Sequence, residues 1–329
     1  MAVVDMRILI TGGTGIIGRA LAIHLVGRGH HVIVLSREPE KSTGLPDEVR
    51  IERWDALTAN GWGSLADGAG ALVNLAGENI TAGRWTPERK RHIRESRLNA
   101  AKAVVQAIET VTNKPRVVVQ ASGIGFYGDC GDDEVTEKTP PGNDFLARFA
   151  VEWERSTSHL QDLGVRWLAI RTGVVLSSEG GALGRMILPI RYFYVRRFGS
   201  GCQWFPWIHI ADEVAAIRFL IENEAAHGPF NLAAPNPVTN AVFSKRLGEG
   251  LGRSVPIPIP SLLLRMFLGE MATVLLYGQR AVPQRLSQMG FTFRFPDIDI
   301  ALQDLLHPKP ILIATARSQK NSRGTQGSL

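Results

Sequence analysis

A glycine-rich turn near the start of the chain constrains the fold more than any other feature. The run T-G-G-T-G-I-I-G at 11–18 follows an apolar segment at 7–10 and opens a helical pattern with apolar residues on one face. A second apolar run, 31–35, comes after that helix. Glycine lets the backbone turn sharply and lets the helix pack closely beneath a pyrophosphate, whose charge a helix N-terminus favours. Because glycine runs alone arise by chance, the prediction of a dinucleotide site depends on this complete order of elements.

The end of the second predicted strand indicates which dinucleotide would bind. Sites for NAD usually have Asp or Glu there to bind the ribose 2′-hydroxyl, whereas this chain has Ser36 and Arg37. A guanidinium and a hydroxyl suit a 2′-phosphate, so the pair favours NADP over NAD. Arg19, just after the turn, is either a second contact to that phosphate or an exposed helix arginine.

Composition and charge are those of an ordinary soluble, enzyme-like protein. The 329 residues are 44% hydrophobic and 21% charged, which allows one large α/β domain or two modest ones. The net charge of +6 includes four basic residues and no acid after Pro308, and without that segment it is +2. A basic cluster at 89–97 lies in a helical pattern, where a solvated face with one cofactor contact is the better interpretation. We therefore expect no nucleic-acid partner.

Cysteine spacing and hydropathy bear on the cell compartment of the protein and on membrane association. Cys130 and Cys202 have neither metal-ligand nor redox-motif spacing, so we expect no metal site and no disulfide framework. The most apolar late segment, 262–277, is interrupted by charges and is too short to span a bilayer. Asp5 and Arg7 interrupt any signal-peptide pattern. These features favour a reducing cytoplasm and predict no membrane association.

Strand and helix patterns continue to alternate as far as residue 171. The predicted elements are strands at 49–55, 71–77, 116–120 and 165–171 and helices at 87–110 and 144–163. The β-branched run at 116–120 is typical of the interior of a parallel sheet and delivers 121–128 to its carboxyl edge, where open α/β folds bind ligands. Right-handed crossovers would place helices on both faces. The fold class is therefore α/β, a doubly wound, Rossmann-like parallel sheet with a smaller C-terminal region.

The regular alternation of strand and helix patterns ends after residue 176. We expect an NADP-binding domain at 1–176, a mixed region at 177–315 that completes the fold and roofs a substrate cleft as a lid, and a disordered polar tail at 316–329. Asp212 is predicted to cap a helix within the middle region. His209 is either catalytic or, as the pattern favours, a hydrogen-bonded histidine beside that helix start.

Further motifs follow the glycine-rich turn in a distinctive order. They are N-L-A-G-E-N at 74–79, E-S-R-L at 95–98, R-T-G-V-V-L at 171–176, P-W-I-H-I at 206–210 and G-Q-R-A-V-P-Q-R-L at 278–286. Over about residues 6–305 the chain resembles the extended short-chain dehydrogenase/reductases, and among them the atypical branch called the epimerase family. The last motif looks like the C-terminal segment of that branch. The resemblance implies a Rossmann-like sheet, a nicotinamide cofactor and a cleft roofed by the C-terminal part.

The resemblance also implies which residues hold the cofactor. In chain order they are Gly12, Thr14, Gly15, Ile16 and Ile17 at the pyrophosphate, Ser36 and Arg37 at the 2′-phosphate, Leu75 and Ala76 beside the adenosine ribose, Arg97 from its helix, and Arg171 near the nicotinamide. Asp55 either meets the adenine or is a surface turn residue. The predicted helices 87–110 and 144–163 match those through which relatives form homodimers.

The expected catalytic residues are only partly present. Ser122 matches the serine that in catalytic relatives hydrogen-bonds the reacting oxygen, although a serine that ties down the strand end is an equal alternative. Those relatives also use a tyrosine followed four residues later by lysine, which lowers the pKa of the tyrosine. No tyrosine of this chain has such a lysine, and a phenylalanine and an arginine stand near the expected place, in 144–149. Neither replaces the proton donor, because arginine stays protonated and phenylalanine carries no proton.

Two other side chains are candidates for the missing acid. Tyr127 follows Ser122 closely, and Glu78 ends the loop after the fourth strand; the alternatives are a packed aromatic and a loop carboxylate. The favoured interpretation is an NADP-dependent oxidoreductase or epimerase that transfers hydride to or from a small polar or sugar-like substrate. The alternative is an NADPH-binding regulatory or partner protein with weak or no turnover.

Overall fold

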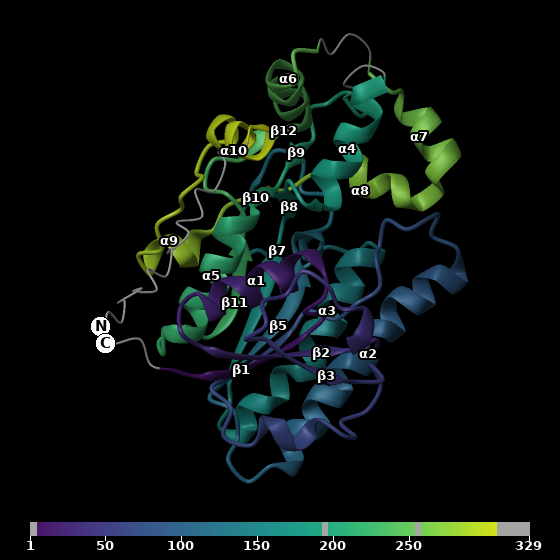
Figure 1. Ribbon diagram of the computed structural model, residues 1–329. Coiled ribbons are helices and arrows are strands. Elements are labelled where there is room, and N and C mark those ends of the chain that lie inside the picture. The colour runs from purple at the N-terminus through teal and green to yellow at the C-terminus, as the bar shows by residue number, and fades with distance from the viewer. Residues whose placement is uncertain (1–4, 193–196, 254–257, 308–329) are drawn as a thin grey trace, which may run out of the picture.

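A seven-stranded sheet forms the centre of the computed structural model, which describes residues 5–192, 197–253 and 258–307. The strand order is β11-β7-β5-β4-β1-β2-β3, and all neighbours run parallel (Figure 1). The strands are β1 (Arg7–Thr11), β2 (His31–Ser36), β3 (Arg50–Arg53), β4 (Ala71–Asn74), β5 (Val117–Gly123), β7 (Arg166–Thr172) and β11 (Gly228–Leu232). The predicted runs at 49–55 and 71–77 end earlier, at Arg53 and Asn74, where the chain turns into loops at the carboxyl edge.

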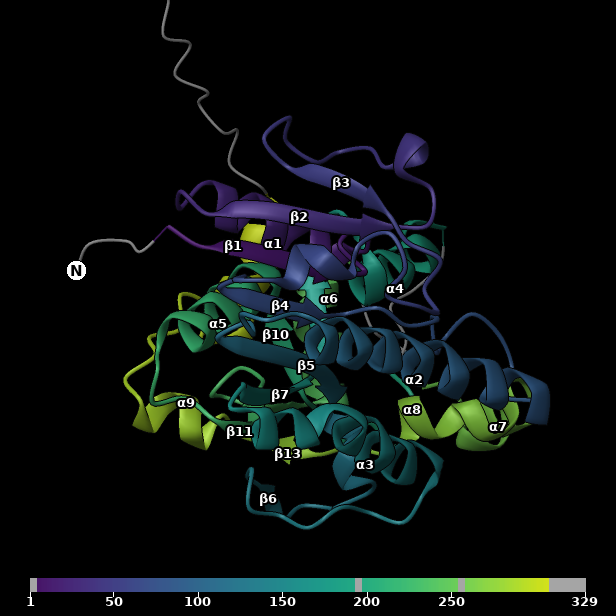
Figure 2. The same ribbon diagram turned by 90° about the horizontal axis from the view of Figure 1, so that it is seen from below.

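Helices cover both faces of the sheet. On one face lie α1 (Ile16–Val26) and α5 (Ile210–Glu222), and on the other α2 (Pro87–Thr110) and α3 (Phe145–Ser158), side by side in Figure 2. Strand β1 shows how both layers form, because Ile8 and Ile10 pack into the core under α1 while Leu9 packs into the core under α2. This arrangement confirms the doubly wound parallel fold.

Short elements complete the chain. The short strands are β6 (Glu134–Val135), β8 (Val174–Ser177), β9 (Trp204–Phe205), β10 (Trp207–His209), β12 (Val238–Thr239) and β13 (Arg280–Ala281). The remaining α-helices are α4 (Gly181–Tyr192), α6 (Asn240–Gly250), α7 (Ser261–Leu268), α8 (Thr273–Leu276), α9 (Gln284–Gln288) and α10 (Ile298–Leu306). The 3₁₀ turns are η1 (Pro39–Lys41), η2 (Gly63–Ala66), η3 (Ile124–Tyr127), η4 (His159–Leu163) and η5 (Gly269–Ala272).

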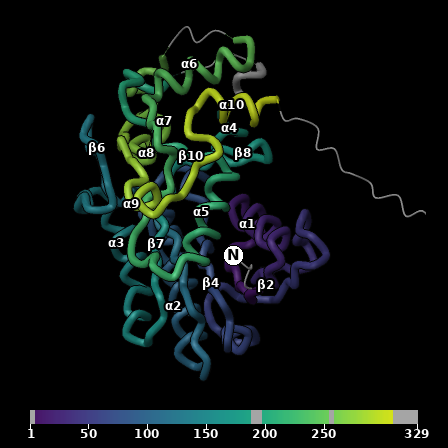
Figure 3. The backbone as a smooth tube through the Cα atoms, turned by 90° about the vertical axis from the view of Figure 1, so that its left-hand side faces the viewer, coloured from purple at the N-terminus to yellow at the C-terminus, as the bar shows by residue number. Residues whose placement is uncertain are grey.

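The C-terminal half contributes to two parts of the molecule. Helices α4, α6, α7 and α10 gather at one end in Figures 1 and 3. Of these, α4, α6 and α10 share a core that includes Trp207, Phe243 and Leu302. The same half also provides β11, an edge strand of the large sheet, and α5, which covers one face of that sheet. The domain boundary at 176 stays a prediction, because elements from both sides of it share the central layers.

The start of α5 corrects one prediction. Asp212 does not cap this helix, because the helix begins two residues earlier and His209 is its N-cap, with Nδ1 accepting a bond from the Ala211 amide at 3.1 Å. The Asp212 carboxylate instead accepts bonds from the backbone amides of Arg294 and Phe295, both at 2.8 Å. Burial lowers the pKa of His209 to about 4, although nearby Asp304 opposes the shift. His209 is thus the hydrogen-bonded histidine at a helix start that the pattern favours.

Two further predictions concern the polar tail and membrane spans. The predicted tail, 316–329, lies outside the described residues. Among the helices of the described part, none has both the length and the apolar character needed to cross a bilayer.

Candidate coenzyme and active site

The glycine-rich turn forms a cradle that only glycine can build. Gly12 has a φ of +66°, and a Cβ on it would lie 2.8 Å from the carbonyl carbon of Leu75. A Cβ on Gly18 would overlap the backbone of Gly12, so helix α1 packs directly on the turn. Gly15 caps α1 without a side-chain hydrogen bond, which leaves the first amides of the helix to a ligand. Thr14, Ile16 and Ile17 stand at this opening and are exposed or half-buried. The cradle therefore fits a pyrophosphate.

Ser36 and Arg37 lie at the carboxyl end of β2, as predicted. The Ser36 hydroxyl is buried, lies 3.0 Å from the Ser42 hydroxyl and accepts a bond from the Glu38 amide at 3.2 Å. The Arg37 side chain is exposed, while its carbonyl accepts a bond from Arg53 at 3.0 Å. The loop thus holds a hydroxyl and a guanidinium at one strand end.

Leu75 and Ala76 lie beside this cradle. Their backbone amides donate to the Thr11 carbonyl at 3.2 Å and to the Thr11 hydroxyl at 3.3 Å. The Thr11 hydroxyl in turn donates to the Asn74 side chain at 2.6 Å. The loop after β4 is therefore fixed against the glycine turn, and the structure brings these two predicted sites together. Asp55, in contrast, accepts bonds from its own turn, which is the surface-turn alternative.

Arg97 reaches the same loop from α2. Its guanidinium lies against Gly77, where a Cβ would be 2.8 Å from Cζ, and over the ring of Trp153 at 5.0 Å. Its Nη1 donates to the Ile93 carbonyl at 3.2 Å, whereas Nε has no partner among the described residues. Burial lowers the pKa of Arg97 to about 10, with Glu78 opposing the shift. A cation with an unsatisfied donor beside the cradle fits an anionic ligand.

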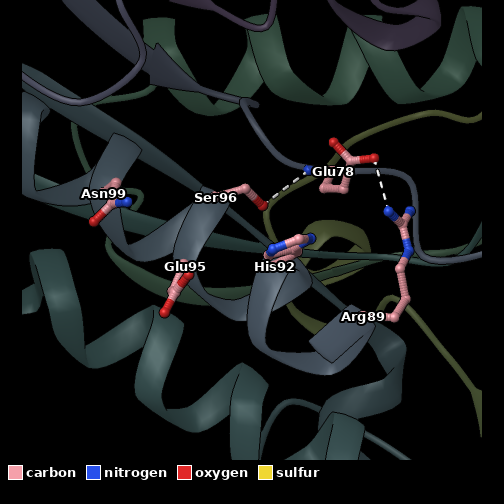
Figure 4. A pocket seen from close by; sticks show the side chains of 6 residues that line it. All are labelled: Glu78, Arg89, His92, Glu95, Ser96 and Asn99. Atoms are coloured by element: carbon pink, nitrogen blue, oxygen red, sulfur yellow. Dashed lines mark hydrogen bonds and ion pairs between the residues drawn. The ribbon is translucent and has the colours of Figure 1, made fainter. Parts of the chain in front are cut away.

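A polar pocket of about 350 Å³ opens on the outer side of α2 beside this loop (Figure 4). Its lining is Glu78, Arg89, His92, Glu95, Ser96 and Asn99. Glu78 is held there by Arg89, whose Nη1 lies 3.1 Å from Oε1, and its amide donates to the Ser96 hydroxyl at 3.1 Å. Glu78 thus has the contacts of a loop carboxylate; its role as an acid stays a prediction.

Ser122 belongs to a buried polar network at the carboxyl edge of the sheet. Its hydroxyl donates to Oε1 of Glu154 at 2.7 Å. Arg171 forms a bidentate pair with the same carboxylate, with Nε to Oε1 at 2.8 Å and Nη2 to Oε2 at 2.9 Å. Burial disfavours the charge on Arg171, but the bonds to Glu154 outweigh it and raise the pKa of Arg171. The nicotinamide contact predicted for Arg171 is untested.

Tyr127 continues this network. Arg171 donates from Nη1 to the phenol oxygen at 2.9 Å, and the phenol donates to Oδ1 of Asn231 at 2.6 Å. Burial raises the pKa of Tyr127 to about 12, although Arg171 favours the phenolate. At neutral pH the tyrosine therefore stays protonated, and its hydroxyl donates its one hydrogen bond to Oδ1 of Asn231. These contacts are those of the packed-aromatic alternative, and the catalytic role of Tyr127 stays a prediction.

Helix α3 offers no replacement acid at the expected position. Arg148 is exposed and donates to the Asn143 carbonyl. Phe145, Phe149 and Trp153 form a ladder, with ring centroids 6.3 and 5.7 Å apart. An apolar ladder therefore occupies the face of α3 that packs toward α2.

Two buried carboxylates of the site, Glu154 and Glu213, were not predicted from the sequence. Glu154 holds the network together, and Glu213 lies fully buried with Oε1 accepting from Thr172 at 2.8 Å and Oε2 without a partner among the described residues. Burial raises the pKa of Glu213 to about 8. Each stands at a helical spacing from buried apolar residues, Ala150 for Glu154 and Ile217 for Glu213. A carboxylate within an apolar helix face was the available signal.

Comparisons with known proteins agree with this geometry. A model of the NAD dependent epimerase/dehydratase family matches residues 8–233, and a model of a domain of unknown function, DUF1731, matches residues 259–305. Epimerase family protein YfhF of Bacillus subtilis (strain 168) is 37% identical over 311 residues, 92% of this chain and 98% of that protein.

Solved structures show the same fold. The human epimerase family protein SDR39U1 (isoform 2) with NADPH has a TM-score of 0.84 and 35% identity over 92% of this chain and 100% of that one. A UDP-N-acetylglucosamine 4-epimerase from Methanobrevibacter ruminantium, at 16% identity and a TM-score of 0.73, shares the fold alone; the match covers 92% of this chain and 97% of that one. The family model covers more than half of the chain, and the chain therefore belongs to the NAD-dependent epimerase/dehydratase family, with a DUF1731 C-terminal domain.

Proposed function

We propose that this chain binds NADP(H) and transfers hydride between the nicotinamide and a small polar or sugar-like substrate, as an oxidoreductase or epimerase. The observation that carries the proposal is the open glycine cradle with Ser36 and exposed Arg37 at the adjoining strand end. A guanidinium suits a 2′-phosphate, and neither Ser36 nor Arg37, the residues that end this strand, is a carboxylate that could bind a free ribose diol. A relative solved with NADPH supports the same choice of coenzyme.

The chain's own residues limit how a proton would move at this site. Bound NADP(H) would supply or accept the hydride; the protein must hold the substrate and move the proton. Ser122 donates its only hydroxyl proton to Glu154, so toward a substrate it presents lone pairs. In this arrangement Ser122 accepts a hydrogen bond from a substrate hydroxyl rather than donating one to a carbonyl.

The same network favours a second candidate, an NADPH-binding regulatory or partner protein with weak or no turnover. Ser122 and Tyr127 both donate their protons within the network, and no tyrosine has a lysine four residues later. Because general acid–base catalysis typically contributes about 10²- to 10⁴-fold, its loss would leave a slow enzyme.

A titration followed by a turnover assay separates these functions. We expect calorimetric heat from NADPH, and then turnover in a screen of carbonyl compounds with NADPH and of alcohols with NADP⁺. Ser122→Ala should abolish the oxidation of alcohols, because the Ser122 hydroxyl accepts a hydrogen bond from the substrate hydroxyl. The matched control is Ser158→Ala at the far end of α3, where the serine hydroxyl donates to the Arg155 carbonyl of the same helix. Tight NADPH binding without turnover of any compound in the screen leaves the second candidate. Absence of heat from both NADPH and NADH with folded protein contradicts both.

The remaining parts of the proposal depend on the sequence and the family. We propose a small-molecule substrate rather than nucleic acid or membrane, a reducing cytoplasm, and a homodimer formed through α2 and α3. Sedimentation of the purified chain tests the dimer, and a monomer at all concentrations would contradict it.

A further inference from the structure

A short hairpin from the C-terminal half lies against the cradle for the coenzyme. Residues 177–181 run from the last residue of β8 to the first residue of α4 and form a tight turn with antiparallel bridges at its base, and its tip carries Glu179. A Cβ on Gly181 would lie 3.0 Å from Cδ1 of Ile16, the first residue of α1. We call 177–181 the strap. It touches the same helix start that would face the pyrophosphate.

Arg19 joins the strap to the 2′-phosphate end of the site. Its Nη2 lies 3.2 Å from Oε2 of Glu179, and a Cβ on Gly44 would lie 3.2 Å from its Nη1. Gly44 belongs to the loop that begins at Ser36 and Arg37, so the guanidinium lies between that loop and the strap. The Nε of Arg19 has no hydrogen-bond partner among the described residues.

The two side chains of this ion pair differ in their exposure to solvent. The Arg19 side chain is 26% exposed, whereas that of Glu179 is 66% exposed. An ion pair this open to water is weak, because solvent screens it and ordering the exposed glutamate costs entropy. A phosphate carries more charge and more acceptor oxygens than a carboxylate, so it would displace the carboxylate from a guanidinium that both can reach.

We propose that Arg19 is a second reader of the 2′-phosphate and that Glu179 competes with that phosphate for it. The inference deepens the proposed function and rests on it. In the coenzyme-free chain, Glu179 neutralises Arg19 and keeps it beside the strap; when the phosphate is present, the guanidinium turns its donors to the phosphate. Arg19 and Glu179 thus set the preference between coenzymes, in addition to Arg37.

The test measures dissociation constants for NADPH and NADH by fluorescence titration. We expect Arg19→Gln to weaken NADPH about 10-fold or more, in line with loss of a charge-assisted hydrogen bond, and to leave NADH unchanged. We expect Glu179→Gln to tighten NADPH about two- to fivefold, the size of an exposed ion pair, again without effect on NADH. In the double variant the effect of Glu179→Gln should disappear.

Matched controls keep this test decisive. Arg28→Gln removes the same charge just after the other end of α1, where the side chain is exposed, and should change neither constant. Thermal unfolding of each variant checks that it folds. Equal weakening of both coenzymes by Arg19→Gln, or weaker NADPH binding by Glu179→Gln, would overturn the inference while leaving the proposed function intact. If the unaltered chain binds neither coenzyme, the proposed function itself fails.

Discussion

Two regions of this molecule treat their polar groups in opposite ways: the glycine cradle with Arg19, Arg37 and Arg97, here called the nucleotide end for its proposed ligand, and the buried network around Ser122, here called the catalytic edge for its proposed role. At the nucleotide end, the Nε atoms of Arg97 and Arg19 have no hydrogen-bond partner among the residues that the structure describes, and Arg37 is exposed. At the catalytic edge, Ser122 and Arg171 are buried and bonded to a common carboxylate. One end therefore holds donors ready for an anionic ligand, and the other has satisfied its donors internally.

This difference predicts that the proposed coenzyme binding and the proposed chemistry are separable in this chain. A buried polar group is stable only when it is paired, and Glu154 pairs both Ser122 and Arg171. A substrate that needs the Ser122 proton must compete with that carboxylate. Among the described residues, no side-chain hydrogen bond caps the start of α1 at Gly15, so the first helix amides have no such competitor. At the nucleotide end the competing carboxylate is that of Glu179, which is exposed and pairs with Arg19.

The largest expected effect comes from breaking the catalytic-edge network. Glu154→Gln would leave Arg171 buried without a counter-charge, and loss of one partner of a buried ion pair costs about 3–5 kcal/mol of unfolding free energy. Urea unfolding measures it. The matched control is Glu152→Gln on the same helix, whose pair with Arg94 is about half exposed and should contribute no more than about 1 kcal/mol. Equal losses would mean that the edge is not a buried network.

A second prediction concerns the cradle. Gly12→Ala should destabilise the fold and abolish coenzyme heat, because a Cβ there meets the Leu75 backbone at a positive φ. Gly29→Ala has the same left-handed cost but nothing within 4 Å of the new methyl. We expect Gly12→Ala to cost about 1–3 kcal/mol more than Gly29→Ala, the usual range for overpacking, in chemical denaturation. Normal NADPH binding by Gly12→Ala would show that the cradle is not the site.

A third prediction tests the exposed guanidinium. Arg37→Gln should lower the preference for NADPH over NADH by about 1.5–3 kcal/mol, the contribution of a hydrogen bond to a charged group. Titration of both coenzymes measures it. Arg50→Gln, which removes an exposed charge from the start of β3, should leave the preference unchanged. An unchanged ratio in Arg37→Gln would remove this arginine from the coenzyme site.

These contrasts also show which parts of the structure can be predicted from sequence. Helix α2 begins at Pro87 and ends at Thr110, as predicted, because its start is encoded locally by proline and by the Thr86 side chain, which accepts from the Arg89 amide. The glycine cradle and the strand end at Ser36 are likewise each encoded by a short continuous segment of the sequence. The prediction that Asp212 caps α5 was wrong, because a ring nitrogen of His209, three residues earlier, accepts the hydrogen bond from the helix start.

The catalytic-edge network could not be predicted, because its members are distant in the chain. Tyr127 and Asn231 lie 104 residues apart, and they meet only because β11 comes to rest beside β7 while η3 follows β5. Which partner satisfies a serine or a tyrosine depends on that packing. The residue types at the site were therefore predictable, but their protonation partners were not.

The most gradual expected effect comes from Glu213, because it is spread over several pH units. Glu213 breaks the pattern of the catalytic edge, since one of its oxygens has no partner in the described part. Its pKa is raised from 4.5 to about 8 by burial, so between these values the folded chain holds a proton that the unfolded chain has lost. The contribution of this group to the free energy of unfolding therefore falls as pH rises from 4.5 to 8, by up to about 1.4 kcal/mol per pH unit, and does not change above pH 8.

Glu213→Gln, which cannot titrate, should remove this slope. His24 and His209, with pKa values near 4, titrate in both proteins and cancel in the difference. A difference that does not vary between pH 5 and 8 would mean that Glu213 reaches water or a cation, and that this side of the edge also satisfies its charges.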